Sequence, residues 1–182
     1  MRAVRVHEHG GPESLTTEDV DVPEPGSGEA RVRIEAAGVN FIDIYHRTGQ
    51  YSLETPATIG VEGAGIVDAV GPDVSDVRPG DRVAFAMQIG SYAEYAVVPT
   101  WKLVPVPDGV ETHQAGALML QGMTAHYLTN DTYALSSGDT ALVYAPAGGV
   151  GQLLVQLCKQ KGARVIGVTS TAEKAETARD VG

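Results

Sequence analysis

The clearest chemical signal in the sequence is a glycine cluster, Gly148, Gly149 and Gly151, that separates an apolar run from a helix-like pattern. Glycine lets the backbone approach a ligand closely, and the N–H groups at a helix N-terminus attract an anion. The spacing approximates the G-x-G-x-x-G motif of dinucleotide-binding proteins, with Pro146 in the first glycine position. Proline lacks an N–H and fixes φ, so we expect a slightly different turn. The cluster predicts a diphosphate site; the alternative is a tight turn without ligand.

A second group of polar residues follows about 20 positions later, where proteins that prefer NAD carry an acid that binds the ribose 2′-OH. This chain has Ser170 there, with Lys174 four residues further on. A hydroxyl and an ammonium bind a 2′-phosphate, whereas an acid repels it, so the pair predicts NADPH. Alternatively, Ser170 is the N-cap of a helix and Lys174 a solvated charge. The two roles are compatible.

The elements around these residues form one strand–helix–strand unit. Residues 141–144 are a short apolar run that predicts a buried strand, and apolar residues recur at helical spacing from Val150 to Cys158. Gly162 follows this helix as a terminating glycine does, and residues 164–168 form a second apolar strand. We expect a parallel βαβ unit with a right-handed crossover.

The first hundred residues are typical of a small, barrel-like antiparallel domain, because short alternating segments are separated by glycine and proline turns. A short helix is expected to begin at Asn40 and to end at Gly49. The expected strands are residues 1–6, 30–35, the glycine-rich stretch 59–70, a strand entered at 77–83, and 91–98.

From Thr112 the pattern becomes helical. Two apolar helices are expected, at residues 115–120 and 124–135, with Gly122 between them. We therefore place the domain boundary within 112–125 and divide the chain into residues 1–120 and 121–182.

Composition narrows the classes of function. The net charge of −10 disfavours nucleic-acid binding, which needs a cationic surface. The single cysteine, Cys158, excludes a disulfide framework and a cysteine-rich zinc site. No run approaches the roughly 18 apolar residues of a membrane span, and the N-terminus lacks the apolar region of a signal peptide, so we expect a cytoplasmic protein without membrane partners.

Several motifs together resemble one family, the zinc-free quinone oxidoreductases, or zeta-crystallin-like group, of the medium-chain dehydrogenase/reductase superfamily. They are HGGPE at 9–13, AAGVNFIDIYHRTGQY at 36–51, GVEGAGIVDAVG at 60–71, PGDRV at 79–83, QGMTAHYL at 121–128 and APAGGVGQLLVQLCKQKGA at 145–163. The resemblance implies an α/β protein, with a GroES-like β-rich catalytic domain in residues 1–120. The first half of a Rossmann NADPH-binding domain follows in 121–182, and the active site lies between the two domains.

The resemblance also assigns cofactor contacts. It places Phe41, Ile42, Asp43, Ile44 and Tyr45 near the nicotinamide, Gly148, Gly149, Val150 and Gly151 at the diphosphate, Ser170, Thr171 and Lys174 at the 2′-phosphate, and Tyr127 on the helix entering the Rossmann domain. From residue type alone, the apolar residues among 41–45 are equally consistent with core positions, and Tyr45 and Tyr127 with packed aromatics.

Asn40 and Tyr51 are the candidate catalytic residues, because an amide can orient a carbonyl and a phenol can donate to a developing oxyanion. Alternatively, Asn40 is a helix N-cap and Tyr51 a loop aromatic. Zinc-dependent relatives carry a cysteine at the position of Asn40 and a histidine at that of Val61, so no metal is expected. His46, His113 and His126 are separated in sequence and lack partners at metal-binding spacing.

The implied activity is direct hydride transfer from NADPH to a bound quinone, with protons from solvent. Reduction of an enone or enoyl group is the rival chemistry. Family members are much longer, so we expect either the N-terminal part of a longer protein or a missing half supplied by a partner. A non-catalytic fragment is the alternative function, and the family analogy favours a homodimer.

Overall fold

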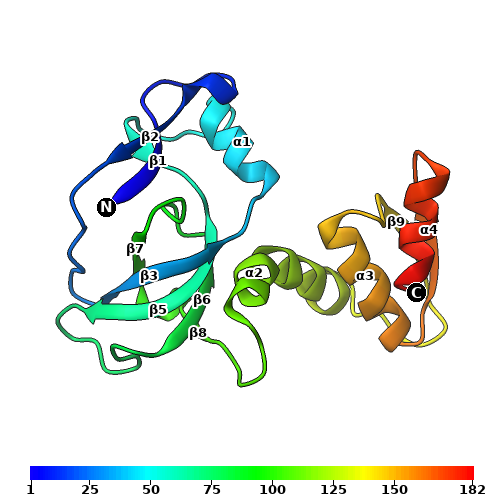
Figure 1. The fold of residues 1–182 in the computed structure, drawn as a ribbon. Coiled ribbons are helices and arrows are strands. Elements are labelled where there is room, and N and C mark those ends of the chain that lie inside the picture. The colour runs from blue at the N-terminus through cyan, green and yellow to red at the C-terminus, as the bar shows by residue number, and fades with distance from the viewer. The chain divides into compact units, whose positions relative to one another are not determined.

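The computed structural model describes all residues from Met1 to Gly182, and the chain divides into two compact units, Met1–Met119 and Leu120–Gly182 (Figure 1). The strands and short helices of the first unit are β1 (Arg2–Val6), η1 (Pro12–Ser14), β2 (Leu15–Asp19), β3 (Glu29–Ala37), α1 (Phe41–Thr48), β4 (Ala57–Thr58), β5 (Glu62–Val70), β6 (Arg82–Ala86), β7 (Tyr95–Pro99), η2 (Thr100–Lys102) and β8 (Val104–Pro105). The helix α2 (Thr112–Tyr127) contributes to both units. The second unit continues with η3 (Leu128–Thr132), β9 (Thr140–Tyr144), α3 (Gly149–Gln160), β10 (Arg164–Val168) and α4 (Ala172–Asp180).

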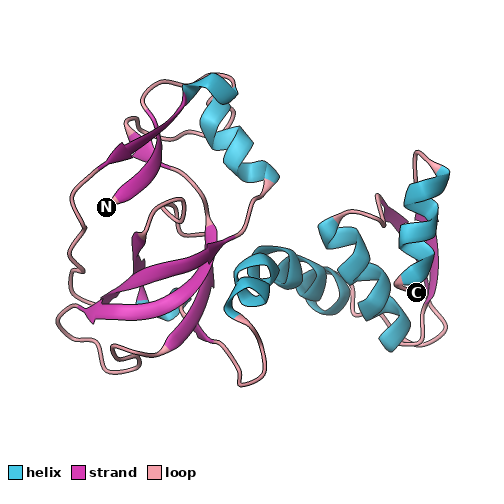
Figure 2. Cartoon of the chain, in the orientation of Figure 1, coloured by secondary structure: helices cyan, strands magenta, loops and turns pink.

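The first unit is built on two antiparallel sheets (Figure 2). The larger sheet has the strand order β7-β3-β5-β6-β8, and the smaller has the order β2-β1-β4. Its strand β2 was missed by the sequence interpretation. Polar residues dominate its sequence, LTTED, and most of its side chains are exposed, so it lacks the apolar alternation that marks a half-buried strand.

Alternating side chains of the larger sheet make the main hydrophobic core of the first unit. Val32 on β3, Val67 on β5, and Val83 and Phe85 on β6 belong to one buried cluster, which Val98 on β7 completes. Small residues allow the strands to approach closely: a Cβ added at Gly65 would overlap the backbone of Arg33 on the neighbouring strand. The predicted close approach of the backbone at the glycines of this sheet is thus confirmed at Gly65.

The helix α1 has the predicted bounds. It begins after Asn40, whose N–H donates to the side chain of Asp43 at 2.8 Å, in the manner of a capping box. It ends at Gly49, which adopts a left-handed conformation with φ of 76°.

The prediction of two separate helices at 115–120 and 124–135 is wrong. The structure has one helix, α2, that continues through Gly122 and passes into the π-helical turn η3. A glycine inside a helix costs about 1 kcal/mol but keeps its N–H. The surrounding Leu, Met and Gln residues favour helix, so the glycine does not end it.

The second unit contains the predicted strand–helix–strand arrangement. β9 and β10 pair in parallel, from Thr140 opposite Arg164 to Tyr144 opposite Val168, and α3 connects them. Gly162, with φ of 77°, follows α3 as expected.

The prediction that residues 141–144 form a buried strand is wrong with respect to burial. Val143 is 6% exposed, but Leu142 and Tyr144 on the other face of β9 are 56% and 73% exposed. The helices α3 and α4 lie against one face, where Val155 of α3 and Ala175 of α4 line a hollow together with Val165 of β10. The opposite face of the two-stranded sheet is therefore uncovered.

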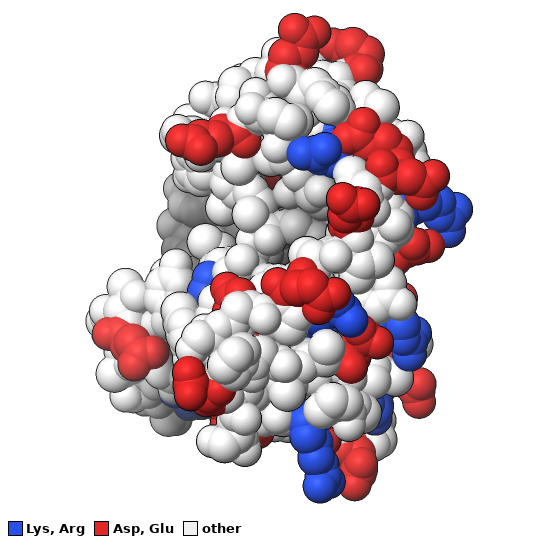
Figure 3. Space-filling model, turned by 90° about the vertical axis from the view of Figure 1, so that its left-hand side faces the viewer, with Lys and Arg blue, Asp and Glu red and all other residues white.

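The surface of the chain reflects its excess of acids. Acidic groups are spread over the face shown in Figure 3, several of them beside arginine or lysine side chains. In the first unit, Arg31 contacts Asp68 at 2.7 Å and Glu24 at 2.9 Å. None of the helices has the length and apolar character required to cross a membrane.

Candidate cofactor and substrate site

The glycine turn of the second unit is closed by backbone hydrogen bonds. The N–H of Ala145 donates to the carbonyl of Val168 at 3.1 Å, which ties the start of the turn to the end of β10. The N–H of Gly148 donates to the carbonyl of Ala145 at 2.9 Å. Ala145 has a φ of 50°, which is unusual for a residue with a side chain and marks a sharp bend after β9. The bend directs the chain into α3 at Gly149.

The glycines of the turn differ in what surrounds them. A Cβ at Gly151 would overlap the carbonyl oxygen of Ala145, so this position must lack a side chain for α3 to pack on the turn. A Cβ at Gly148 would meet only the Ala145 oxygen, at 3.3 Å, and its φ of −79° suits any residue. Gly148 is therefore not required by the protein's own packing, and its open side is accessible to a ligand.

A cavity of about 430 Å³ lies beside this turn. It joins two groups that are separated in sequence, the glycine turn and the residues after β10. Its lining residues are Ala145, Ala147, Gly148, Val168, Thr169, Ser170 and Lys174. The structure thus brings the predicted diphosphate-binding turn and the predicted 2′-phosphate residues to one hollow.

Ser170 and Lys174 lie next to one another, because Nζ of Lys174 is 3.4 Å from Oγ of Ser170. The alternative in which Ser170 caps the helix is wrong. Thr171 is the N-cap of α4, and its hydroxyl accepts a hydrogen bond from the N–H of Lys174 at 3.3 Å. Both Ser170 and Lys174 line the cavity, with the N-terminus of α4 beside them.

In the first unit, the predicted nicotinamide contacts occupy α1 and its start. Phe41 is 76% exposed and Ile44 is 40% exposed, so neither is a core residue and that alternative is wrong for both. Ile42 and Tyr45 are half-buried. Asp43, by contrast, is 4% exposed, and its carboxylate lies inside the unit.

Asp43 belongs to a buried polar network. One of its oxygens, Oδ2, accepts hydrogen bonds from the N–H of Asn40 at 2.8 Å and from the hydroxyl of Tyr92 at 2.7 Å. The amide nitrogen of Asn40 donates in turn to Oε2 of Glu62 at 2.8 Å. Burial of Tyr92, together with its bond to Asp43, raises the pKa of the phenol well above its ordinary value. Tyr92 therefore remains a neutral donor at physiological pH.

The hydrogen-bond network contains two residues that the sequence analysis did not include among the site candidates. Glu62 and Tyr92 were missed as site residues. Glu62 had a recognisable signal, since it is a lone acid inside the apolar, glycine-rich stretch GVEGAGIV. Tyr92 gave none, because an aromatic residue in a strand-like segment is most often structural.

Tyr51 lies close to α1. Its ring is 5.3 Å from that of Tyr45 and 6.1 Å from that of His46, and its N–H donates to the carbonyl of Tyr45 at 3.0 Å. The side chain is 48% exposed. The structure thus gathers Asn40, Tyr45 and Tyr51 around one short helix of the first unit.

The remaining candidates are less informative. Tyr127 is at the last position of α2, in the second unit, and is 48% exposed. Val150 and Thr171 lie in the first turn of α3 and at the start of α4. Nowhere in the chain do three His, Cys, Asp or Glu side chains gather in a way that could hold a metal ion.

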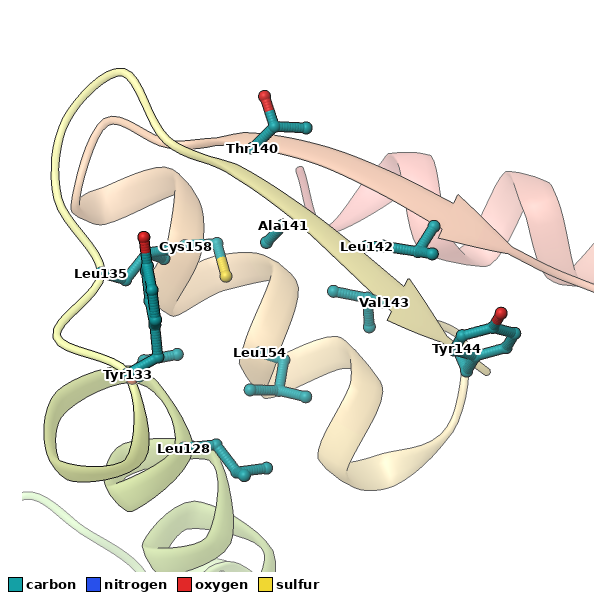
Figure 4. A pocket seen from close by; sticks show the side chains of 11 residues that line it. Leu128, Tyr133, Leu135, Thr140, Ala141, Leu142, Val143, Tyr144, Leu154 and Cys158 are labelled. Atoms are coloured by element: carbon teal, nitrogen blue, oxygen red, sulfur yellow. The ribbon is translucent and has the colours of Figure 1, made fainter.

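A second cavity, of about 400 Å³, lies along β9 (Figure 4). Figure 4 shows apolar side chains around it, among them Leu128, Leu154 and Val143, with Cys158 from α3. Burial raises the pKa of the Cys158 thiol, so the thiol is not activated as a nucleophile. No charged side chain lines this cavity, and it is unsuited to a phosphate-bearing ligand.

Part of the first unit resembles a known family of domains. Residues 26–108 match the family model of the alcohol dehydrogenase GroES-like domain. This domain, followed by a parallel strand–helix–strand unit with a glycine turn, is the arrangement that the sequence motifs predicted.

Individual proteins are similar to the chain over nearly its whole length, which is more specific than the match to the family model. A quinone oxidoreductase from Pseudomonas aeruginosa is 47% identical over 96% of the chain and 54% of its own length. A 2-haloacrylate reductase from a Burkholderia species is 44% identical over 100% of the chain and 57% of its own length. The crystal structure of Escherichia coli quinone oxidoreductase complexed with NADPH is 37% identical, with a TM-score of 0.97 over 100% of the chain and 56% of that protein. The chain is similar to these quinone oxidoreductases and spans about half the length of the relatives it matches.

Proposed function

We propose that the protein is an NADPH-dependent quinone oxidoreductase that transfers a hydride to a quinone without a metal. The observation that carries the proposal is the cavity of the second unit, which Gly148, Ser170 and Lys174 line together. A nucleotide with a diphosphate and a 2′-phosphate matches this combination of an open glycine turn, a hydroxyl and an ammonium. Homology to the quinone oxidoreductases supports the same cofactor and the same reaction.

Residues 1–120 would then serve as the GroES-like catalytic domain and residues 121–182 as the first half of the Rossmann domain. In this proposal Gly148, Gly149, Val150 and Gly151 hold the diphosphate. Ser170, Thr171 and Lys174 hold the 2′-phosphate. Phe41, Ile42, Asp43, Ile44, Tyr45 and Tyr127 form the remaining cofactor surface, with Asp43 acting from inside the first unit, where its carboxylate orders the start of α1.

The catalytic roles fall to Asn40 and Tyr51. When bound, NADPH supplies a hydride from the nicotinamide ring. Addition of the hydride to a quinone leaves negative charge on the quinone oxygen, and a side-chain N–H of Asn40 would donate to that oxygen. The Tyr51 hydroxyl would donate to the same region, and a proton from solvent would complete the hydroquinone. The exposed apolar side chains of Phe41 and Ile44 would exclude water from the reacting atoms.

A second candidate is the reduction of an activated carbon–carbon double bond, because a 2-haloacrylate reductase is 44% identical to the chain. The cofactor site would be the same, and only the acceptor would differ. We also propose, from the family resemblance, a cytoplasmic homodimer with no nucleic-acid or membrane partner.

The test is the oxidation of NADPH by the purified chain, followed by the absorbance of NADPH, with 1,4-benzoquinone, 2-chloroacrylate or neither. Turnover with the quinone alone is the expected result. Turnover with the chloroacrylate alone would replace the quinone by an activated carbon–carbon double bond as the acceptor. No turnover with either acceptor, in a chain that unfolds cooperatively, would favour a non-catalytic binding module and contradict the proposal.

Gly148→Ala provides a matched test of the cofactor site. The alanine fits the φ of this position, and its methyl group would meet only the Ala145 oxygen at 3.3 Å, so the fold is expected to tolerate it. The methyl group would occupy the open side of the turn. We expect NADPH to bind at least about tenfold more weakly with an unchanged melting temperature. Unchanged binding would place the diphosphate elsewhere.

A further inference from the structure

Glu62 is a carboxylic acid in the interior of the first unit. It is the first residue of β5, pairs with Ala86 of β6, and is 0% exposed. A buried carboxylate is costly unless it is hydrogen-bonded or paired. The only other buried acid is Asp43. An acid in the interior therefore needs hydrogen-bonding partners that hold its carboxylate.

The surroundings of Glu62 hold its carboxylate in one place. A Cβ at Gly38 would overlap Oε2 of Glu62, so the absence of a side chain at Gly38 makes room for the carboxylate. The N–H of Gly38 donates to the main-chain carbonyl of Glu62 at 3.1 Å. The end of β3 is thereby fixed to the start of β5 next to the carboxylate.

Asn40 is bound to the interior at two points. Its N–H donates to Asp43, and its side-chain nitrogen Nδ2 donates to Oε2 of Glu62 at 2.8 Å. A side-chain amide carries two N–H groups on one nitrogen, so the bond to Glu62 uses one and keeps the second for another acceptor. The terminal torsion of asparagine is otherwise soft, and without an anchor the amide would sample both orientations.

We propose that Glu62 is a positioning residue, which anchors the Asn40 amide through Nδ2 so that the second N–H of this amide can donate to a carbonyl oxygen of the substrate. The inference rests on the proposed function and deepens it, because it specifies which atom of Asn40 meets the substrate. Glu62 acts only through Asn40 and does not touch the substrate. A preorganised donor stabilises the developing oxyanion more than a donor that must first rotate into place.

An exchange of the two side-chain types tests the proposal. The variants are Glu62→Gln, Asn40→Asp and the double variant Asn40→Asp/Glu62→Gln. Each single variant disturbs the hydrogen bond between positions 40 and 62. Glu62→Gln places an amide opposite the Asn40 amide, and Asn40→Asp places a carboxylate opposite the Glu62 carboxylate. The double variant restores one donor and one acceptor at the same place, but with the donor on position 62. Glu94→Gln is the matched control, since it also converts a glutamate to an amide, at a side chain that is 46% exposed and pairs with Arg2.

We expect Glu62→Gln to lower kcat for the quinone by at least about tenfold and Asn40→Asp by about 100-fold, with NADPH affinity unchanged. The double variant should regain the melting temperature of the wild type but not its kcat, because position 40 would then only accept hydrogen bonds. The control should retain kcat. Recovery of kcat together with the melting temperature in the double variant would show a purely structural pair and overturn the inference, as would an unchanged kcat in Glu62→Gln.

A measurement without turnover separates this inference from the proposed function. The two Nδ2 protons of Asn40 are followed by nuclear magnetic resonance while duroquinone is added in the absence of NADPH. One proton should exchange slowly because it is bonded to Glu62, and the other should shift with the quinone. Glu62→Gln should abolish both effects. Such a shift in a chain that does not oxidise NADPH would sustain the inference and reject the reductase. If the enzyme is active but the Asn40 protons do not shift, the reductase is sustained and the inference is rejected.

Discussion

The sheets of the two units differ in how far their apolar side chains are buried. In the first unit, Val32 and Phe85 are 0% exposed within a sheet-based core. In the second unit, Leu142 and Tyr144 are 56% and 73% exposed on one face of the two-stranded sheet. Ile166 and Val168, opposite them on β10, are 42% and 43% exposed. The main core of the first unit is enclosed within that unit, whereas the second unit covers only one face of its sheet.

This difference bears on how each unit forms its part of the site. The Asn40 amide of the first unit is held by buried side chains, so its position depends on the core. The glycine turn of the second unit is held by local backbone contacts between Ala145, Gly148 and Val168, which require only the β9–α3–β10 arrangement. A ligand site made from backbone can therefore persist in a unit whose sheet is half uncovered.

The largest effect that would test this comparison is a loss of core volume. Phe85→Ala removes a fully buried ring and is expected to lower the free energy of unfolding of the first unit by about 3–5 kcal/mol. Leu142→Ala, at an exposed position, is expected to change stability by less than about 0.5 kcal/mol. Urea denaturation followed by circular dichroism measures both. Equal losses would mean that the Leu142 face is covered in solution.

A smaller effect concerns the glycine turn. Gly151→Ala places a methyl group against the carbonyl oxygen of Ala145, and we expect a loss of about 1–3 kcal/mol, since backbone atoms must shift to accommodate it. Gly148→Ala is the matched variant, because its methyl group would meet the same oxygen at 3.3 Å, a much milder contact than the overlap at Gly151. Thermal unfolding compares the two. A melting temperature lowered equally in both variants would show that the turn is strained as a whole.

The buried network gives an effect of similar or smaller size. Tyr92→Phe removes a donor to Asp43, and we expect a loss of about 1–3 kcal/mol at neutral pH, because a buried acceptor loses a partner. Burial and the bond to Asp43 raise the pKa of Tyr92, so its contribution is complete below the ordinary tyrosine pKa and declines as the pH rises through the folded value. The wild type should thus lose stability in strong alkali more steeply than the variant. Parallel alkaline curves for the two proteins would contradict the assignment.

The smallest effect is on the surface of the first unit. The hydrogen bond from His7, followed by that from Arg5, lowers the pKa of Glu18. A lowered pKa means that the contribution of Glu18 is present above its ordinary value and is lost as the pH falls. Glu18→Gln should flatten the acid side of the stability curve slightly, and mainly at low salt, because the half-buried carboxylate is still reached by solvent and its ion pairs are screened. An effect that persists in high salt would require a buried interaction instead.

The elements with strong local signals were predictable from sequence. The strand–helix–strand unit, the start of α1 at Asn40 and its end at Gly49 follow from periodicity and from turn residues. The continuity of α2 through Gly122 did not follow, because a single glycine interrupts a pattern without ending a helix. The strand β2 was missed because it is stabilised by pairing with β1, and its own sequence carries no apolar pattern that predicts this pairing.

The part of the candidate site that is formed by backbone groups could be predicted from the sequence. The glycine turn and Ser170 with Lys174 could be found from spacing, although the cap of α4 is Thr171. The network of Glu62 and Tyr92 could not, because it joins side chains far apart in sequence. Likewise, a strand's apolar run predicts that it can be buried, but not that a second layer covers it, as β9 demonstrates.

We propose that NADPH binds in the cavity between the glycine turn and Lys174. Calorimetric titration of the chain with NADPH and with NADH, in the wild type, in Lys174→Ala and in Lys159→Ala, tests it most directly. Lys159 is the matched control, because it is an exposed lysine on α3 that does not line the cavity. We predict tighter binding of NADPH than of NADH in the wild type and in Lys159→Ala, and a loss of about tenfold in that preference in Lys174→Ala. Equal affinities for the two nucleotides in the wild type, or an unchanged preference in Lys174→Ala, would contradict the claim.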